Sequence, residues 1–448
     1  MKIKLISPRM SLRPMDSEYK RLLSPSVSLL IVAAMTPKKH HVWVEDENAR
    51  KLHLDDRPDL VGITVNVDTS LRAYEIAQRY RNRGVPVVLG GIHASACPDE
   101  GLQYANAVCI GEAEDVWKQI LSDCENRALK QRYYNDQPTD LARVPIPRWE
   151  LLDKSRYLYS NIVNASRSCC FQCEFCYNSC GYVHHIYRNR PVANVVEEIR
   201  HHDTRQIMFI DDNFIGNPEW TREFVRAIKD MDLTWHAAVS ANIGAYPDLL
   251  DEMQASGCRS LFIGFESINS DSVASVSKRQ NKVERYETTI REIHDRRIMI
   301  NASMAFGFDH DRPSVFRETL DWLIANKIET MTGHILTPYP GTRLYLRLLS
   351  EGRIVDHNPS HYNTSHVVFE PRLMSREQLL DGYLWIYDQF YALDSVFRRM
   401  PEDSGRRVPY LLFNLGYRKY GKLTSLVARF GLMNAFGRLA RRLAYGIE

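Results

Sequence analysis

Hydrophobic residues in the first part of the chain alternate between short apolar runs, typical of strands, and one-sided patterns, typical of helices. Leu71–Arg83 has its apolar positions spaced for one face of a helix. Strands are predicted at Ile3–Ser7, His41–Glu45, Leu60–Val65, Val85–Leu89 and Ala107–Ile110. This alternation predicts a parallel, doubly wound sheet, on which ligands bind at the carboxyl ends of the strands. We therefore predict an α/β domain over residues 1–128.

A second alternating series begins near Tyr159, after a stretch without periodicity that contains Pro138, Pro145 and Pro147. We interpret that stretch, residues 129–158, as a linker. Strands are predicted at Asn161–Ala165, Gln206–Ile210, Thr234–Val239, Ser260–Gly264, Ile298–Ala305 and Thr330–Leu336, with helices at Val192–His201, Trp220–Asp230, Pro247–Ser256 and Val315–Asn326. Six β/α units predict a partial (β/α)6 barrel over residues 159–345, with its chemistry at the carboxyl ends of the strands.

The strand pattern ends near residue 374, and we expect residues 346–448 to be mostly helical. Residues 375–400 are rich in aromatic side chains, whereas residues 405–448 contain nine Lys or Arg and one acidic residue, Glu448. A basic segment with helical spacing is either a solvated face packed over the barrel or a contact for an anionic substrate, phospholipid or partner.

Bulk composition narrows the class of protein. A chain of 448 residues with 44% hydrophobic and 25% charged residues is an ordinary globular protein of two or three domains. The formal net charge of +3 gives no indication of nucleic-acid binding. The sequence contains no run of 18 apolar residues, so we predict no transmembrane helix. The first apolar stretch is too short for a signal peptide. We expect a cytoplasmic protein, with peripheral membrane contact possible only through the basic tail.

Five of the nine cysteines fall within twelve residues: Cys169, Cys170, Cys173, Cys176 and Cys180. In a reducing compartment such a cluster indicates a metal site rather than disulfides. Two iron–sulfur spacings overlap in this segment. One is a three-cysteine set with spacing Cys-x3-Cys-x2-Cys, and the other is a four-cysteine run like that of bacterial ferredoxins. A closed zinc site with four ligands is the third option.

Context favours the three-cysteine set, Cys169, Cys173 and Cys176. A ferredoxin run is usually followed by Pro and accompanied by a second cysteine set, but here Gly181 follows and no second set occurs. Three ligands on a loop after the first strand of a barrel would leave one iron open. Cys170 would then be a spare thiol beside the cluster, as would Cys180.

The segment Arg167–Cys180, with Phe175 just before the last cysteine of the set, resembles the radical S-adenosylmethionine superfamily. The resemblance implies a [4Fe–4S] cluster whose open iron chelates the methionine part of S-adenosylmethionine. One electron from an external reductant, such as flavodoxin or ferredoxin, then breaks a carbon–sulfur bond and gives a 5′-deoxyadenosyl radical.

Segments at the ends of later strands resemble the same superfamily, and they imply further contacts with S-adenosylmethionine. The segment Phe209–Phe214 takes the place of a Gly-Gly-Glu segment but lacks its glycines, and plain helix capping by its polar residues is an equal alternative. Met304–Phe308 and Thr337–Thr342 resemble the fifth- and sixth-strand segments, although a β-turn accounts for them equally well. The residues expected to bind this cofactor are Asp211, Asp212, Ser240, Asn242 and Glu266.

The N-terminal segments Thr36–Glu47, Asp59–Val65, Leu89–Ala94 and Ile110–Glu114 resemble a cobalamin-binding domain of the kind fused to class B-like radical methyltransferases. This resemblance implies cobalamin, with Thr64, Gly90 and Gly91 as expected contacts. The Asp-x-His-x-x-Gly motif that supplies a histidine ligand to cobalt is absent, and His93 lacks its spacing. A related flavodoxin-like domain that binds no cobalamin is the alternative.

Together the two resemblances imply a cobalamin-dependent methyltransferase that acts on an unactivated carbon of a small-molecule or lipid-like metabolite. Two alternatives stay open: radical cyclisation, oxidation or transfer of another fragment, and a non-catalytic electron-transfer or cobalamin-sensing protein. We assign no catalytic acid or base, because isolated barrel histidines such as His236 and His334 are more often structural. The sequence does not identify the substrate.

Overall fold

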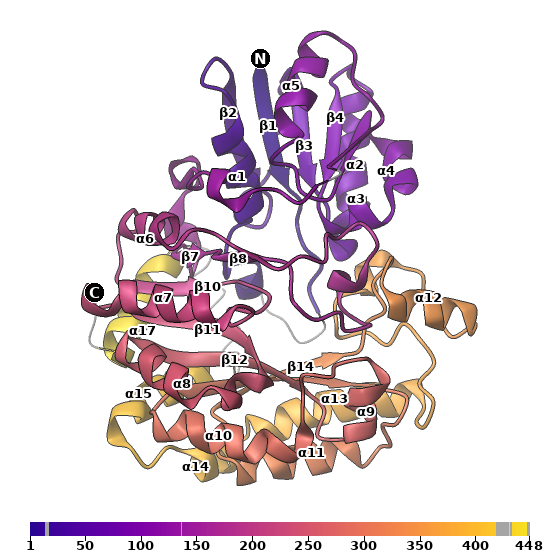
Figure 1. Cartoon of the computed structure of the whole chain (residues 1–448). Coiled ribbons are helices and arrows are strands. Elements are labelled where there is room, and N and C mark those ends of the chain that lie inside the picture. The colour runs from indigo at the N-terminus through magenta and orange to yellow at the C-terminus, as the bar shows by residue number, and fades with distance from the viewer. Residues whose placement is uncertain (14–17, 136, 418–429, 431, 446–448) are drawn as a thin grey trace.

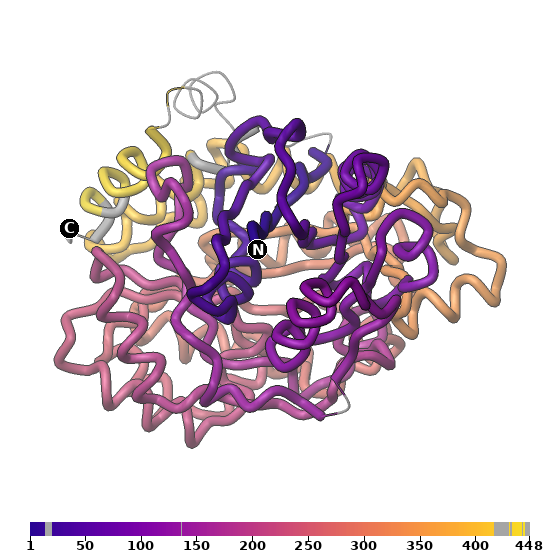
Figure 2. The backbone as a smooth tube through the Cα atoms, turned by 90° about the horizontal axis from the view of Figure 1, so that it is seen from above, coloured from indigo at the N-terminus to yellow at the C-terminus, as the bar shows by residue number. Residues whose placement is uncertain are grey.

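The computed structural model describes residues 1–13, 18–135, 137–417, 430 and 432–445. Two parallel six-stranded sheets dominate the architecture, one above the other (Figure 1). The strands of the N-terminal sheet run up and down in that view, and those of the second sheet run across it. Seen from above, the N-terminal domain lies over the barrel (Figure 2).

The N-terminal sheet has the order β2-β1-β3-β4-β5-β6, and every pair in it is parallel. Its central strands β3, β4 and β5 are buried on both faces, which explains their nearly continuous apolar runs. The doubly wound sheet predicted from the sequence is thereby confirmed. The strands are β1 (Lys2–Ser7), β2 (His41–Asp46), β3 (Leu60–Thr64), β4 (Val87–Gly90), β5 (Ala107–Ile110) and β6 (Arg132–Tyr134).

Strand β6 lies inside the segment that we interpreted as a linker, where it pairs with β5. The predicted domain bounds themselves stay a prediction. The helices that flank this sheet are α1 (Val27–Met35), α2 (Ser70–Arg81), α3 (Ile92–Ala96), α4 (Pro98–Tyr104) and α5 (Trp117–Glu125).

The second sheet has the order β14-β13-β12-β11-β10-β7 and is also entirely parallel. It confirms the predicted partial (β/α)6 barrel. Its strands are β7 (Ile162–Val163), β10 (Gln206–Phe209), β11 (Thr234–Ser240), β12 (Cys258–Glu266), β13 (Met299–Phe306) and β14 (Thr330–Ile335). A short antiparallel pair, β8 (Ser166–Arg167) and β9 (Arg188–Asn189), brackets the cysteine-rich segment.

Helices cover the outer face of this barrel and continue into the C-terminal region, whose helical character is confirmed. They are α6 (Val192–Arg200), α7 (Pro218–Ala227), α8 (Pro247–Ala255), α9 (Ser270–Ser275), α10 (Tyr286–Asp295), α11 (Val315–Ala325), α12 (Arg343–Ser350), α13 (Arg376–Phe390), α14 (Leu393–Arg399), α15 (Ser404–Tyr417) and α17 (Met433–Tyr445). Of these, α12 lies at one side of the molecule and α17 at the other (Figure 1).

Hydrophobic packing connects the two domains. Val67, in the turn after β3, belongs to the core of the barrel. A second cluster joins Leu30 and Ile31 of α1 to Ile162 of β7. The carboxyl edge of the N-terminal sheet therefore rests directly on the barrel. Among the described residues, no helix combines the length and the apolar character that a membrane span requires.

Candidate functional site

The cysteine-rich loop, residues 168–180, leaves the barrel directly after β8. Ser168 has a left-handed backbone with φ of 64°, so the chain reverses sharply before the first cysteine. The loop is then held to the barrel, because the backbone N–H of Glu174 donates to the carbonyl of Val276 at 3.0 Å. All five cysteines of the loop are free thiols. A loop fixed in this way can present several sulfur ligands from one side.

Two side-chain amides, one from the loop itself and one from the segment after α9, donate to sulfur atoms of this loop. Asn178 donates to Cys176 Sγ at 3.6 Å, and Gln280 donates to Cys173 Sγ at 3.6 Å. Hydrogen bonds to ligating sulfur stabilise its negative charge and are a regular feature of iron–sulfur sites. The donor set of the loop therefore fits a [4Fe–4S] cluster held by Cys169, Cys173 and Cys176.

The environment of the Cys176 thiol favours its protonated form. Burial, reinforced by the charges of Asp212 and Cys173, raises the pKa of Cys176 to about 12. Metal binding at this thiol therefore has to displace a proton.

Cys180 and Cys170 have different surroundings. A Cβ placed on Gly341 would lie 3.4 Å from Cys180 Sγ and 3.1 Å from Ala96 Cβ, so Cys180 is turned toward the N-terminal domain. Cys170 is exposed and accepts a hydrogen bond from Asn213 at 3.7 Å. Cys170 also shares a side-chain hydrogen bond with Cys169, and the choice of the three-cysteine set over the ferredoxin spacing stays a prediction.

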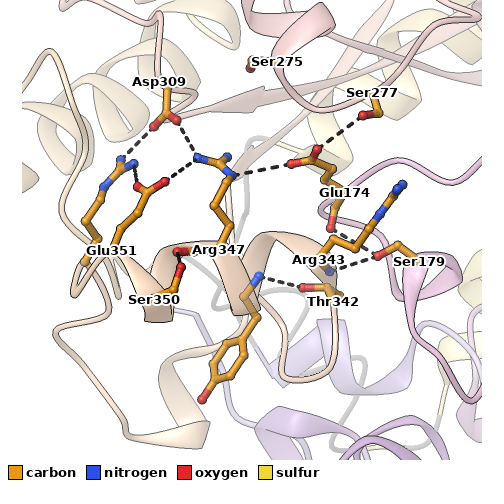
Figure 3. A network of polar contacts seen from close by, with 12 residues as sticks. Glu174, Ser179, Ser275, Ser277, Asp309, Thr342, Arg343, Arg347, Ser350 and Glu351 are labelled. Atoms are coloured by element: carbon orange, nitrogen blue, oxygen red, sulfur yellow. Dashed lines mark hydrogen bonds and ion pairs between the residues drawn. The ribbon is translucent and has the colours of Figure 1, made fainter.

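The start of α12 clamps the middle of the loop (Figure 3). Arg347 lies between two carboxylates, 2.8 Å from Asp309 and 3.6 Å from Glu174, which follows Cys173 directly. The backbone of Leu344 donates to the carbonyl of Glu174 at 3.0 Å, and Ser277 donates to its carboxylate at 3.3 Å. Sequence analysis missed Arg347, because nothing in its local pattern indicates a contact with a loop about 170 residues earlier.

The two aspartates at the end of β10 have different roles. The carboxylate of Asp211 is buried and accepts hydrogen bonds from the backbone of Ala165, at 3.0 and 3.2 Å, and from the hydroxyl of Ser166. Burial raises the pKa of Asp211 to about 6. These contacts indicate that Asp211 joins β10 to the start of the loop. Its predicted cofactor contact stays untested.

Asp212 is exposed and faces the loop. It accepts a hydrogen bond from Tyr177 at 2.7 Å and one from Asn178 at 3.3 Å. Because Asn178 also donates to Cys176, one amide connects the carboxylate of Asp212 to a cluster cysteine. Of the two aspartates, Asp212 is the one whose carboxylate lies beside the sulfur ligands.

Ser240 and Asn242, both expected at the cofactor site, do lie together at the end of β11. The Ser240 hydroxyl donates to Asn242 Oδ1 at 2.5 Å, and the Ser240 backbone N–H donates to Asn213 Oδ1 at 3.2 Å. The Nδ2 atom of the same Asn213 side chain donates to Cys170 Sγ. A single amide side chain, not singled out from the sequence, therefore connects the end of β11 to the cysteine loop.

Glu266 ends β12 in a buried ion pair that the sequence did not predict. Lys278 Nζ lies 2.6 Å from Glu266 Oε1, and both side chains are about nine-tenths buried. Glu266 has a left-handed φ of 66° at a bulge in the strand, and such strain clusters at functional sites. A Cβ on Gly264 would lie 2.6 Å from the Glu266 carboxylate, so only glycine allows the carboxylate to fold back here.

Lys278 also lies close to the cysteine loop. Its Nζ is 5.8 Å from the centre of the Phe175 ring. Burial by itself lowers the pKa of Lys278, but Glu266 and the sulfur atoms of Cys173 and Cys176 outweigh it and raise the pKa. The site therefore contains a fixed positive charge between the Glu266 carboxylate and the predicted cluster ligands.

The carboxyl edge of the N-terminal sheet meets the same loop. A Cβ on Gly111, which follows β5, would lie 3.7 Å from the carbonyl of Tyr182. Glu112 pairs with Arg188 at 2.6 Å, and Glu114 pairs with Arg167 at 2.5 Å. Residues directly after β5 thus bind residues on both sides of the cysteine loop.

Gly91 and Thr64, two of the expected cobalamin contacts, lie against one another at this edge. A Cβ on Gly91 would lie 2.8 Å from the backbone N of Val65 and 3.0 Å from Thr64 Oγ1, and Gly91 has a φ of 99°. Gly91 is therefore required by chain packing, whatever binds here. Gly90, the third expected contact, is half-buried beside it and leaves backbone at the edge of the sheet.

His93, His236 and His334 each contact a residue outside the cysteine loop. His93 is buried in α3, directly after β4, with Nε2 3.5 Å from Glu100. Within the barrel, His236 contacts Ser260 at 2.7 Å and His334 contacts Thr364 at 3.2 Å. These contacts agree with the structural interpretation of the barrel histidines.

The fold and the site together define a class: an iron–sulfur enzyme with a partial (β/α)6 barrel and a ligand-binding parallel sheet over its cluster loop. Comparison with known proteins identifies that class. Residues 163–323 match the radical SAM superfamily, residues 23–121 match the B12-binding domain, and residues 342–404 match a domain of unknown function. The chain therefore contains a radical SAM domain and a B12-binding domain.

Individual relatives and structures agree with this assignment. The chain is 29% identical over 390 residues to the bacteriochlorophyllide d C-12(1)-methyltransferase of Chlorobaculum tepidum, covering 84% of this chain and 85% of the relative. It is 27% identical over 350 residues to the hopanoid C-2 methylase of Rhodopseudomonas palustris, covering 74% and 65%.

A solved structure shares the whole architecture. The radical S-adenosylmethionine methyltransferase TsrM of Kitasatospora setae, with cobalamin and a [4Fe–4S] cluster bound, superposes with a TM-score of 0.68 at 16% identity. The superposition covers 97% of this chain and 99% of that chain. The protein is thus a radical SAM enzyme whose class uses a [4Fe–4S] cluster, S-adenosylmethionine and cobalamin. Enzymes of this class require an external electron donor.

Proposed function

We propose that this enzyme transfers a methyl group to an unactivated carbon of a small-molecule or lipid-like substrate. The observation that carries the proposal is the contact between the carboxyl edge of the N-terminal sheet and the segments that flank the cysteine loop, through Gly111 and the pairs Glu112–Arg188 and Glu114–Arg167. Two cofactors bound at these two places would lie on either side of one substrate. The methyltransferase activity of the bacteriochlorophyllide and hopanoid relatives supports the same conclusion.

The chain's own residues would position the reactants. With its cofactors bound, the site supplies a carbon-centred radical for hydrogen abstraction and a methyl group for transfer. Cys169, Cys173 and Cys176 hold the cluster, and Asp212 offers a carboxylate beside them for the ammonium group of S-adenosylmethionine. Ser240 and Asn242 offer further polar contacts from the end of the next strand.

Glu266 is the candidate for the ribose hydroxyls. One of its carboxylate oxygens takes the Lys278 ammonium, and the other has Ser303 at 3.5 Å, which leaves it capacity to accept a hydrogen bond. Holding reactants in a fixed, buried geometry is the main contribution that such residues make to rate. The electron comes from an external one-electron donor such as a flavodoxin or ferredoxin.

The test is an anaerobic reconstitution with iron, sulfide and cobalamin, followed by incubation with reductant, S-adenosylmethionine labelled in its methyl group, and a lipid and metabolite extract. Methyl transfer predicts that 5′-deoxyadenosine and S-adenosylhomocysteine form together, with a product one labelled methyl group heavier. Deoxyadenosine without S-adenosylhomocysteine would instead indicate cyclisation, oxidation or transfer of another fragment.

Matched variants within the same loop give this test its control. Cys176→Ala removes a predicted ligand and should abolish both the cluster absorbance and deoxyadenosine formation. Cys170→Ala removes an exposed neighbouring thiol and should preserve both. Loss of iron on Cys170→Ala with retention on Cys169→Ala would contradict the proposed ligand set.

A further inference from the structure

The last described helix, α17, exposes a stripe of large apolar side chains. Phe436, Leu439 and Leu443 are 40, 57 and 59% exposed, and their spacing of three and four residues places them on one face, because an α-helix has about 3.6 residues per turn. Leu432, which directly precedes the helix, is 53% exposed and lies four residues before Phe436. Contiguous exposed apolar side chains of this kind mark surfaces that bind a partner or a membrane. We call these four residues the α17 stripe.

The exposure of the stripe does not come from a loosely attached helix. On the adjoining face, Met433 is fully buried and packs against Leu22 and Leu158. Asn434 Nδ2 donates to Ser160 Oγ at 3.1 Å. The helix is therefore fixed in rotation, with its stripe directed outward.

The charged side chains next to the stripe indicate which kind of surface would bind it. Arg438 and Arg442 are exposed on the same helix, beside the stripe on the side away from Met433. In the sequence, residues 405–448 contain nine Lys or Arg and a single acidic residue, although four of these basic residues and the acidic one lie outside the described residues. A second copy of this chain would bring two basic helices together, which like charges oppose, whereas an anionic lipid surface neutralises them. An apolar stripe flanked by arginines is typical of helices that lie in a membrane interface.

We propose that α17 docks this enzyme on an anionic membrane surface. The leucines and the phenylalanine of the stripe insert at the boundary of the lipid chains, and Arg438 and Arg442 contact the phosphates. Because α17 packs where Leu22 of the N-terminal region meets Leu158 before the barrel, docking brings the junction of the two domains to the lipid. If the proposed function holds, the substrate class is an amphipathic molecule that resides in the membrane.

The experiment is flotation of the reconstituted holoenzyme with vesicles of phosphatidylcholine alone or mixed with phosphatidylglycerol. Leu439→Gln/Leu443→Gln should weaken binding to the anionic vesicles at least tenfold, because two exposed leucines lose their insertion. The matched control is Leu346→Gln/Leu349→Gln, which changes two leucines of α12 that are 57 and 48% exposed, at the other side of the molecule. This control should bind like the unchanged enzyme.

Substitution of the two arginines tests the electrostatic contribution to membrane binding. Arg438→Gln and Arg442→Gln should each weaken binding about fivefold at low salt, and added salt should weaken the unchanged enzyme. Equal binding to neutral and anionic vesicles, or equal loss in the α12 control, would overturn the proposal. So would a dimer in solution that Leu439→Gln/Leu443→Gln dissociates, since the stripe would then be an interface between copies.

Cleavage of S-adenosylmethionine without vesicles separates the two proposals. A docking variant should still form deoxyadenosine and S-adenosylhomocysteine with a substrate dissolved in detergent, so failure of docking leaves the proposed reaction standing. An enzyme that floats with vesicles but never forms S-adenosylhomocysteine would reject the reaction and keep the docking surface.

Discussion

The buried pair of Glu266 and Lys278 makes a sharp prediction about stability. Replacing Lys278 with Met keeps most of the side-chain volume but leaves the Glu266 carboxylate charged, nine-tenths buried and without its partner at 2.6 Å. Ser303, at 3.5 Å from the other oxygen, replaces little of that interaction. Removing one partner of a buried pair typically costs about 3–5 kcal/mol, because the remaining charge has lost both water and its counter-ion. We expect a loss in that range for Lys278→Met.

A double-mutant cycle separates this pairing from simple loss of packing. Glu266→Gln removes the charge while retaining a polar group of the same shape, and the double variant Glu266→Gln/Lys278→Met carries no unpaired charge. The double variant should therefore be more stable than Lys278→Met alone, with a coupling of roughly 2 kcal/mol. Independent, additive losses would refute the view that the pair is energetically coupled.

The assay is urea unfolding of the cluster-free protein, followed by tryptophan fluorescence, with iron and sulfide content measured separately after reconstitution. Because Lys278 also lies beside Phe175 and the thiols of the loop, Lys278→Met should lower cluster content as well as stability. Glu266→Gln should retain the cluster, since it keeps the lysine. Full cluster content in Lys278→Met would show that this positive charge does not support the loop.

Three further substitutions test single features. Asp211 has a pKa of about 6 in the folded protein, above its ordinary value of 3.8. Between pH 3.8 and pH 6 the folded state therefore binds more protons than the unfolded state. The free energy of unfolding consequently falls as the pH rises through this range. Asp211→Asn should remove that fall, which amounts to about 3 kcal/mol, in unfolding curves measured from pH 4 to 7; an unchanged slope would contradict it. Gly91→Ala should cost at least about 2 kcal/mol, because alanine disfavours the left-handed backbone and its Cβ would press on Val65; a stable variant would show that the edge can shift. Arg347→Met should increase the rate of iron loss to a chelator roughly fivefold, the equivalent of about 1 kcal/mol, because the ion pairs that hold the loop are lost. An unchanged rate of iron loss would show that Arg347 does not stabilise the loop.

Sequence analysis predicted well those features that depend on residues close together in the sequence. The three cysteines lie within eight residues, and the strands of both sheets appear as apolar runs because parallel strands are buried on both faces. Strand β6 was not predicted, because it lacks such an apolar run. It has three residues, only Tyr133 of which is buried, and it exists because it pairs with β5. Its pattern alone cannot be distinguished from that of a loop.

Roles that depend on contacts across the fold could not be predicted in the same way. Asp211 and Asp212 are adjacent in sequence, and only the direction in which each side chain leaves β10 makes one structural and the other a neighbour of the cysteines. Lys278 reaches Glu266 because the strand bulges at Gly264, and a bulge has no reliable sequence signature. Arg347 depends on the docking of α12 against the loop (Figure 3).

The relation between the two domains explains how one chain can combine two cofactors. Both sheets are parallel, so each gathers its loops at a single edge, and the ion pairs of Glu112 and Glu114 with Arg188 and Arg167 bring those edges face to face. Glu114 is 6% exposed and Arg188 14%, so water screens these charges less than it would at an open surface. The proximity that a radical reaction with two cofactors requires is therefore already present in the folded protein. Charge reversal at Glu114 should consequently reduce methyl transfer more than it reduces cleavage of S-adenosylmethionine, because it separates the domains without touching the cysteines.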